Sequence, residues 1–414
     1  MANRHTLQDL KYLQALPLDM KIRLTQQRIR EWVNHFGLDG VYVSFSGGKD
    51  STVLLDICRE IYPATKAVFA DIPTQYPELR QFVKTYENVD IIRPSMGFVE
   101  VCEKYGFPLI SKEVSECIDS SRRYLTNLKK RNDALTDRQT DRQTDRQTVK
   151  GAYALADILG IERREKGKKL SDYENLKKGI LPELEWDDKY PNGAPVRLLQ
   201  LYGRLPHKEK GKKTNTYSEM YDKSKWKFFL DAPFEISNKC CKVMKKQPLH
   251  KYMKETGRVP MTAQMADESR LRTSQWIKHS CNVFDSNTPI SNPMSFWTEQ
   301  DVLWYIRSRN LPICSVYGDV VSDDEEMGQI DLMQYTGLDE YDRGSQPLHC
   351  TGCQRTGCVC CGFGAHIDGS DRFVRLKETH PKMYQLLDIC KNNGYTMRQA
   401  IDWIAEHSDV VIKY

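Results

Sequence analysis

The sequence predicts an α/β protein built on a doubly wound parallel sheet. From residue 41 to residue 105, short apolar runs rich in β-branched residues alternate with patterns of helical period. A Ser- and Gly-rich turn, SFSGGKDS at residues 44–51, separates the first such run from the helical pattern that follows it. Ligands of doubly wound sheets bind at the carboxyl ends of the strands, and this turn occupies such an end.

The expected elements alternate in order along the chain. A helical stretch over 7–36 ends at Gly37, which suits a helix C-cap. The elements expected after it are a strand at 41–43, a helix over 53–61, a strand at 65–71, a helix over 77–87 opened by Pro77, a strand at 89–93, and helices over 98–105 and 113–130.

Length and composition bound the organisation of the chain. The 414 residues suggest two or three folding units. No run of about 18 apolar residues exists, and the polar first residues lack a signal-peptide centre, so a cytoplasmic protein with no membrane contact is expected. Thirteen cysteines in such a protein favour metal ligands or reactive thiols over disulfides. The expected divisions are 1–36 (N-terminal helices), 37–120 (first part of the core), 121–230 (a basic, mostly helical insertion), 231–345 (second part of the core) and 346–414 (a Cys-rich segment and C-terminal helices).

The turn at 44–51 has the chemistry of a phosphate-binding loop. Adjacent glycines let backbone N–H groups approach an anion, the following helix N-terminus adds partial positive charge, and Lys49 adds a full one. Ser46 and Ser51 offer hydroxyl donors, and Ser51 also suits a helix N-cap. The G-x-x-x-x-G-K-[ST] loop of kinases and GTPases does not fit this spacing.

The order S-G-G-K-D-S resembles the pyrophosphate loop of the ATP-pyrophosphatase superfamily, which has the adenine nucleotide alpha-hydrolase-like fold. That superfamily includes phosphoadenosine-phosphosulfate (PAPS) reductases, ATP sulfurylase small subunits and thiolation enzymes of tRNA or DNA. The resemblance implies an ATP or PAPS-like nucleotide with Mg²⁺, the metal held by Asp50 or Asp71. The loop residues expected to bind the nucleotide are Ser44, Ser46, Gly47, Gly48, Lys49, Asp50 and Ser51.

Two further segments resemble nucleotide-binding motifs of the PAPS reductases, each with departures. Asp71-x5-Pro77-Glu78 resembles D-T-G-x-x-F-P-E, with Ile72-Pro73 in place of Thr-Gly; alternatively, Asp71 ends a strand and holds its turn. The stretch 265–272, MADESRLR, resembles the R-R-D-E/Q-S-x-x-R phosphate clamp. Arg272 keeps the last position and Arg270 lies near it, whereas Met265 and Ala266 replace the leading arginines. The alternative is a helix with surface arginines. The catalytic residues implied are Lys49, Asp50, Asp71 and Arg272.

Clustered cysteines indicate a metal site. Glycines and thiols in HCTGCQRTGCVCCGFG, residues 349–364, suit an iron–sulfur cluster or zinc. Cys240-Cys241, followed by Lys246 and Pro248-Leu249, resembles the C-C-x-x-R-K-x-x-P-L motif of iron–sulfur adenylyl-sulfate reductases. With the G-C-x-x-C of those enzymes, the resemblance implies a 4Fe-4S cluster, with Zn²⁺ as the alternative. The implied ligands are Cys240, Cys241, Cys358 and Cys361, with Cys281, Cys350 and Cys353 as alternates.

The helix that begins after Thr298 is expected to be scaffold. Thr298 and Asp301 form a predicted capping box, and the family has the same W-T-x-x-D-V helix followed by Leu311-Pro312 and Tyr317.

The segment 121–230 holds 26 Lys and Arg against 16 Asp and Glu, and it contains a DRQT repeat that keeps no apolar face. Its charge suits contact with tRNA or DNA, and a solvated helical face is the alternative.

Three functions stay open at this point. The first is an ATP-pyrophosphatase that adenylylates an acceptor for sulfur transfer, served by a sulfur donor or a redox protein. The second is reduction of PAPS or adenylyl sulfate to sulfite. The reductases end in an E-C-G-L-H cysteine, whereas this sequence ends in HSDVVIKY, and Cys390 is expected to be a buried core residue. The third is a non-catalytic regulator that binds nucleotide and nucleic acid. A homodimer is also among the states that the sequence leaves open.

Overall fold

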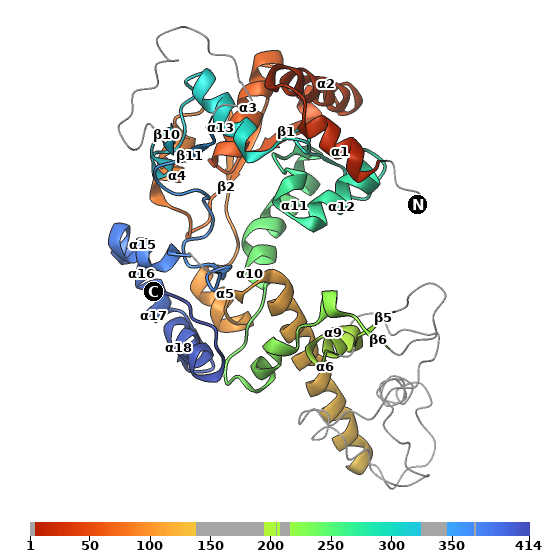
Figure 1. Ribbon diagram of the computed structural model, residues 1–414, viewed down its shortest axis with the longest axis vertical. Helices are drawn as coiled ribbons and strands as arrows, with labels where there is room; N and C mark the ends of the chain where they lie inside the picture. The colour runs from red at the N-terminus through yellow and green to blue at the C-terminus, as the bar shows by residue number, and fades with distance from the viewer. Residues whose placement is uncertain (1–4, 138–193, 204, 208–215, 324–345, 368–369) are drawn as a thin grey trace. The chain divides into compact units, whose positions relative to one another are not determined.

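The computed structural model describes residues 5–137, 194–203, 205–207, 216–323, 346–367 and 370–414 (Figure 1). The chain divides into two compact units: unit 1 comprises Met1–Gly97 and Cys241–Val359, and unit 2 comprises Phe98–Cys240 and Cys360–Tyr414. Residues 138–193, which include almost all of the DRQT repeat, lie outside the described residues.

Unit 1 is built on a six-stranded sheet with the strand order β3-β2-β1-β7-β9-β8. The strands are β1 (Val41–Ser44), β2 (Ala67–Ala70), β3 (Val89–Ile92), β7 (Val259–Met261), β8 (Asn282–Val283) and β9 (Ile290–Ser291). Every neighbouring pair is parallel except β8 with β9. The predicted α/β class is therefore confirmed, with one antiparallel edge strand added to the parallel sheet.

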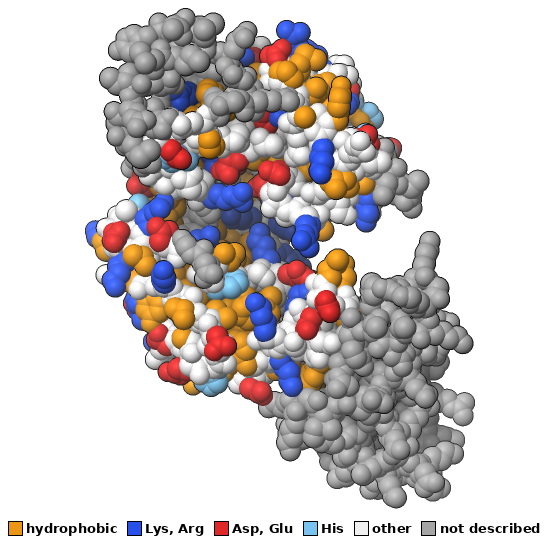
Figure 2. Space-filling view, viewed as in Figure 1, with side chains coloured by type: hydrophobic (Ala, Val, Ile, Leu, Met, Phe, Trp, Pro, Cys, Tyr) orange, Lys and Arg blue, Asp and Glu red, His pale blue; other side chains and the backbone are white. Residues whose placement is uncertain are grey.

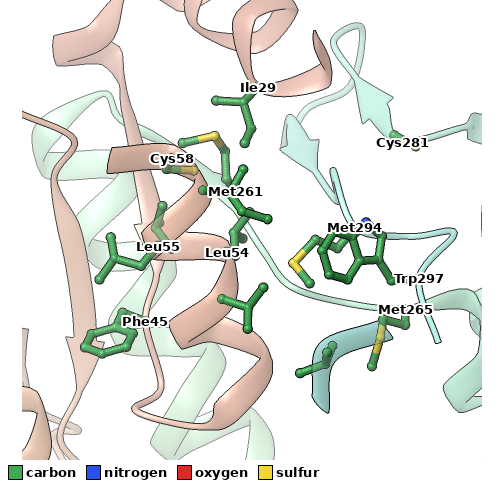
Figure 3. Close-up of a cluster of buried hydrophobic side chains, with 14 of the residues drawn as sticks. Ile29, Phe45, Leu54, Leu55, Cys58, Met261, Met265, Cys281, Met294 and Trp297 are labelled. Atoms are coloured by element: carbon green, nitrogen blue, oxygen red, sulfur yellow. The ribbon is translucent and has the colours of Figure 1, made fainter. Parts of the chain in front are cut away.

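Helices cover both faces of the sheet of unit 1. Successive side chains of a strand point to opposite faces, so one strand packs against helices on both sides. Val41 and Val43 lie in the larger core with residues of α2, α3 and α13. Figure 3 shows part of this core, in which Leu54 and Leu55 of α3 lie near Met261 of β7, and Ile29 of α2 lies above them in the view. Tyr42 points to the other face, where its ring lies 5.3 Å from that of Tyr252 in α11. Helices on both faces are the defining feature of a doubly wound sheet.

The helices of unit 1 follow the predicted order with changed bounds. They are α1 (Leu7–Gln14), α2 (Leu18–Phe36), α3 (Lys49–Ile61), α4 (Pro77–Lys84), α11 (Gln247–Thr256), α12 (Arg270–His279) and α13 (Glu299–Ser308). Short helical turns are η1 (Leu38–Gly40), η4 (Lys242–Lys246), η5 (Ala266–Glu268) and η6 (Ser315–Tyr317), and β10 (Val320–Ser322) pairs antiparallel with β11 (Leu348–Cys350).

Two helix predictions in unit 1 needed correction, and two were confirmed. The single stretch 7–36 is two helices, because Pro17 has no N–H to donate and caps α2 instead. Helix α4 begins at Pro77 as predicted but ends at Lys84. The predicted cap at Gly37 is confirmed, since Gly37 has φ +76° and its N–H donates to the Val33 carbonyl at 2.8 Å.

Unit 2 contains the long helix α6 (Lys112–Asp137), which extends beyond the predicted 113–130, and α5 (Phe98–Tyr105), which matches its prediction. Its other elements are β4 (Leu109–Ile110), α9 (Ala194–Leu201), β5 (Pro206–His207), β6 (Thr216–Tyr217), η2 (Glu219–Tyr221), η3 (Ser224–Asp231), α10 (Lys239–Cys241, which runs into unit 1), β12 (Gly362–Phe363), α15 (Arg372–Thr379), α16 (Pro381–Tyr384), α17 (Leu386–Ile389), β13 (Lys391–Asn392), β14 (Tyr395–Thr396) and α18 (Met397–His407).

Cys390 is fully buried in unit 2, as expected of a core cysteine. It ends α17 in extended conformation and does not lie inside a helix, because its carbonyl accepts from Met397 N–H at 3.1 Å and the chain turns into the β13–β14 hairpin. In the part of the chain that the structure describes, no helix combines the length and apolar character needed to cross a membrane.

Candidate functional site

The predicted phosphate-binding loop connects β1 to α3 in unit 1. Gly47 has φ +73°, a conformation that side chains other than glycine's rarely adopt. A Cβ at this position would lie 3.0 Å from Val83 Cγ2 and 3.3 Å from Leu79 Cδ2. The loop therefore requires glycine at position 47 for its backbone conformation and for its close approach to α4.

Hydroxyl groups hold the loop in shape. Ser51 Oγ accepts from Ser46 N–H at 3.1 Å and donates to the Gly48 carbonyl at 2.9 Å, and Ser46 Oγ accepts from Gly48 N–H at 3.2 Å. The prediction that Ser51 caps the helix is wrong. The N-cap is Gly48, which makes no side-chain cap bond, and Ser51 is the third helical residue with its hydroxyl turned back to the loop. Fixed in this way, the loop brings the first turn of α3 to the carboxyl end of β1, with the Gly48 N–H donated to Ser46 Oγ.

The ammonium group of Lys49 contacts two oxygen acceptors. Its side chain is only 4% exposed, and its Nζ donates to Glu299 Oε1 at 2.8 Å and to the Gln354 carbonyl at 2.6 Å. Its backbone N–H donates to the Tyr317 hydroxyl at 3.2 Å. An anion that reaches Lys49 must therefore compete with the Glu299 carboxylate for the ammonium group.

Asp50 follows Lys49 in the chain, and one of its carboxylate oxygens makes no hydrogen bond with the described residues. Its Oδ1 is buried and has no hydrogen-bond partner among the described residues. Burial raises the pKa of Asp50 above its usual value, while the charges of Lys49, Arg355 and Arg272 act to lower it. A carboxylate with a free oxygen beside a phosphate-binding loop has the donor chemistry that Mg²⁺ prefers.

Asp71 differs from Asp50 because both of its carboxylate oxygens lie close to arginine side chains. It follows β2, and its two oxygens form ion pairs with Arg80 Nε at 2.6 Å and Arg93 Nε at 3.2 Å. The carboxylate is 14% exposed. With both oxygens facing guanidinium groups, Asp71 fits a metal ligand less well than Asp50 does, and its contacts suit the alternative in which it holds the turn after its strand.

The two arginines of the altered clamp lie in different surroundings. Arg272 forms an ion pair with Glu268, and its charge is close enough to act on the pKa of Asp50. Arg270, two residues earlier on α12, lines a shallow depression together with Leu7 and Ile277. Residues two apart on a helix point to different sides. Arg272 and Arg270 therefore point to different sides of α12, and it is the charge of Arg272 that acts on the pKa of Asp50.

Four residues of the site were not predicted as functional. Tyr317 was expected to be scaffold, and Glu299, Gln354 and Arg355 were assigned no role. Glu299 is the first residue of α13, and Tyr317 ends η6. The only sequence feature that could have predicted a role for Glu299 and Tyr317 was their place in or after the W-T-x-x-D-V segment. Arg355 lies between cysteines, and no sequence pattern predicted a role for it.

The predicted metal ligands are divided between the two units. Cys241 and Cys358 belong to unit 1, whereas Cys240 and Cys361 belong to unit 2. Within the described residues, no group of three or more His, Cys, Asp or Glu side chains is placed to hold a metal ion. The four-thiolate cluster therefore stays a prediction.

The alternate cysteines are all in unit 1 and differ in their surroundings. Cys281 is buried in the apolar core (Figure 3). Cys350 is buried at the end of β11, where burial raises the pKa of its thiol and the Lys49 charge opposes that shift. Cys353 Sγ lies 3.7 Å from the Tyr76 hydroxyl. Cys350 therefore lies near the loop without forming part of a metal site.

The chain matches a family model described as the phosphoadenosine phosphosulfate reductase domain over residues 40–123 and 198–362, more than half of its length. It belongs to that family. The predicted membership in the PAPS reductase family of the ATP-pyrophosphatase superfamily is thereby confirmed, and the matched residues include the loop, Arg272 and the Cys-rich segment.

A solved structure of a phosphoadenylyl-sulfate (PAPS) reductase from Candida auris, a phosphate complex, is similar at 12% sequence identity and a TM-score of 0.31, covering 82% of this chain and 97% of that chain. No curated protein matches the chain. PAPS reductase-family membership supports the coarse prediction of an enzyme of nucleotide-linked sulfur metabolism that binds an adenine nucleotide.

Proposed function

We propose that this member of the PAPS reductase family is an ATP-pyrophosphatase-type transferase, which adenylylates an acceptor and so prepares it for sulfur transfer. The observation that carries the proposal is the loop at Ser46–Ser51, whose hydroxyl network presents the first turn of α3 and Lys49 to an anion. An adenine nucleotide is the ligand that the family membership favours.

The reaction requires the release of pyrophosphate. An oxygen of the acceptor attacks the α-phosphorus of ATP, the bond from that phosphorus to the bridging oxygen breaks, and pyrophosphate leaves with both bonding electrons. A sulfur nucleophile from a donor then displaces AMP. The protein contributes by positioning and by offsetting negative charge, through the N–H groups of α3, Lys49 and Arg272.

Mg²⁺ is expected to accompany ATP and to neutralise charge on the phosphates. Asp50 is the residue that would hold it, because its buried Oδ1 has no hydrogen-bond partner in the described part of the chain.

An iron–sulfur cluster on Cys240, Cys241, Cys358 and Cys361 stays a prediction from the resemblance of the cysteine motifs. Its implied ligands are divided between the two units, and no step of the reaction is assigned to it. Iron, sulfide and zinc analysis of anaerobically purified protein, with its visible absorption spectrum, distinguishes a cluster from zinc and from free thiols.

The test of the proposal is product analysis with the full chain. We expect AMP and pyrophosphate from ATP in the presence of tRNA or DNA, and loss of both products in Lys49→Ala. Arg23→Ala is the matched control, because Arg23 is 75% exposed on α2 and pairs only loosely with Asp19 at 4.0 Å. Formation of ADP, or no turnover with either acceptor, would contradict the proposal.

The second candidate is reduction of PAPS or adenylyl sulfate to sulfite, which the description of the matching family favours. Sulfite release that depends on a dithiol protein of the thioredoxin class would establish it. No sulfite under conditions in which a control reductase is active would remove it.

Contact with tRNA or DNA is proposed for the basic segment 121–230, from its charge balance. Several of its described cations are already paired: Arg122 with Glu235, Arg123 with Asp119, and Lys223 with Glu113. On the face seen in Figure 2, the described residues show both Lys and Arg side chains and Asp and Glu side chains. Binding that weakens steeply with salt and disappears when residues 121–230 are deleted would support the contact. The number of cysteines, thirteen, and their uneven clustering favour metal ligands or reactive thiols, and therefore a reducing compartment such as the cytoplasm.

A further inference from the structure

The segment Thr351–Gly357 is tied to the phosphate-binding loop on both sides of Arg355. On one side, the Gln354 carbonyl accepts from Lys49 Nζ at 2.6 Å. On the other, Thr356 Oγ1 lies 2.6 Å from the Tyr317 hydroxyl, which in turn accepts from Lys49 N–H at 3.2 Å. Both neighbours of Arg355 in the sequence are therefore linked to the first residue of α3.

Backbone hydrogen bonds to the η6 region hold the start of this segment. The N–H of Gly352 donates to the Tyr317 carbonyl at 2.8 Å, and the N–H of Cys353 donates to the Val316 carbonyl at 2.9 Å. A Cβ at Gly352 would lie 2.5 Å from the Val316 carbonyl oxygen, so the close approach depends on glycine. The segment thus has a defined position against unit 1, and the side chain of Arg355 starts from a fixed point.

Arg355 is an exposed cation that makes no hydrogen bond or ion pair with any residue the structure describes. Arg355 therefore offers a guanidinium group from a segment that is hydrogen-bonded to Lys49 and Tyr317 beside the loop. A guanidinium group binds phosphate and sulfate through charge-assisted hydrogen bonds.

We propose that Arg355 binds a second anionic group, a phosphate or sulfate, of the adenine nucleotide whose first phosphates occupy the Ser46–Ser51 loop. Arg355 is then a specificity-determining residue that selects nucleotides carrying this further group. It supplies charge that the leading arginines of the clamp would supply, where this chain has the buried residues Met265 and Ala266. The inference rests on the proposed function for the identity of the nucleotide, but not for the presence of the anion site.

The experiment is calorimetric titration of the full chain with four probes: AMP, ATP, adenosine 3′,5′-bisphosphate and inorganic pyrophosphate. We expect Arg355→Ala to weaken binding of ATP, of the bisphosphate or of both by about 10- to 100-fold, the range for a lost hydrogen bond to a charged group. AMP affinity is expected to change less than about twofold, Arg355→Lys to restore part of the loss through its charge, and Arg23→Ala to behave as wild type. Because Arg355 makes no hydrogen bond or ion pair with the described residues, its variants are expected to keep the wild-type Tm.

The probes separate the possible outcomes. Loss confined to ATP places the group in the polyphosphate chain, and loss confined to the bisphosphate places it on the ribose. Equal affinities of Arg355→Ala and wild type for all four probes would overturn the inference. If wild type binds pyrophosphate but no adenine nucleotide, and Arg355→Ala weakens that binding, the anion site stands while the proposed function fails. If wild type binds none of the probes, both are overturned.

Discussion

The buried ion pair between Lys21 of α2 and Asp301 of α13 is expected to hold α13 in place within unit 1. Lys21 Nζ lies 2.7 Å and 2.6 Å from the two oxygens of Asp301, and the side chains are 1% and 0% exposed. Lys21→Met keeps the length of the side chain but leaves the carboxylate buried without its charge partner. Breaking a buried pair in this way costs about 3–5 kcal/mol.

The expected loss lies near the lower end of that range. Asp301 also accepts from Thr298 N–H at 2.7 Å and from Thr298 Oγ1 at 2.8 Å in the capping box of α13, which was predicted from the sequence and is confirmed. These bonds stay in Lys21→Met and stabilise the remaining negative charge. A loss of about 3 kcal/mol corresponds to amide hydrogen exchange about 100-fold faster in α2 and α13, if these helices open together.

Hydrogen exchange of the full chain measures this effect locally, which matters because a chain of two units need not unfold in one step. The matched control is Arg23→Met, on the same helix but with its weak surface pair, which is expected to cost at most about 0.5 kcal/mol. Adding Asp301→Asn to Lys21→Met removes the unpaired charge and is expected to restore much of the stability. A loss below about 1 kcal/mol in Lys21→Met, or strictly additive effects in the double variant, would refute the reasoning.

Three other perturbations address the loop. Tyr317→Phe removes the hydroxyl that accepts from Lys49 N–H and contacts Thr356. We expect a stability loss of about 1–3 kcal/mol in denaturant titration and weaker pyrophosphate binding in calorimetry. Unchanged binding would contradict the role of Tyr317. Gly47→Ala places a Cβ at φ +73° and is expected to cost on the order of 1–3 kcal/mol, measured as a lower Tm; an unchanged Tm would show that the loop adjusts freely. Asp50 has a raised pKa, so the folded chain keeps a proton that the unfolded chain releases, and the unfolding free energy falls as the pH rises from 3.8 through the raised pKa. Asp50→Asn is therefore expected to be more stable than wild type at neutral pH, with a difference that closes toward pH 3.8, and denaturant titrations that show no such convergence would argue against a buried, raised carboxyl.

Local patterns predicted the elements that carry the loop. The limits of α5 agree with prediction at both ends, and β1 starts at Val41 as expected, because alternation and helical period are properties of neighbouring residues. The break at Pro17 was visible in the sequence and was overlooked. The end of α17 at Cys390 was not visible, because it depends on a hairpin contact with Met397.

Local sequence patterns could not predict the residues that surround Lys49. Lys49 contacts Glu299, Tyr317 and Gln354, which follow it by about 250 to 305 positions. Nothing in the sequence measures such a distance in space. The motif of the phosphate clamp predicted both Arg272 and Arg270, although the two side chains point to different sides of α12, because a motif match does not state which side of a helix faces the site.

The replaced clamp arginines and the unpaired Arg355 have one explanation in common. Met265 and Ala266 are buried in the core of unit 1, where a charged side chain would cost several kcal/mol. Positive charge near Asp50 must then come from a different part of the chain, and Arg355 supplies it from a segment that Lys49 and Tyr317 hold in place. Recognition of an anion depends on where charges lie and not on which segment carries them. On this argument, restoring arginine at 265 or 266 is expected to destabilise unit 1 without improving anion binding, whereas removing Arg355 weakens anion binding without affecting stability.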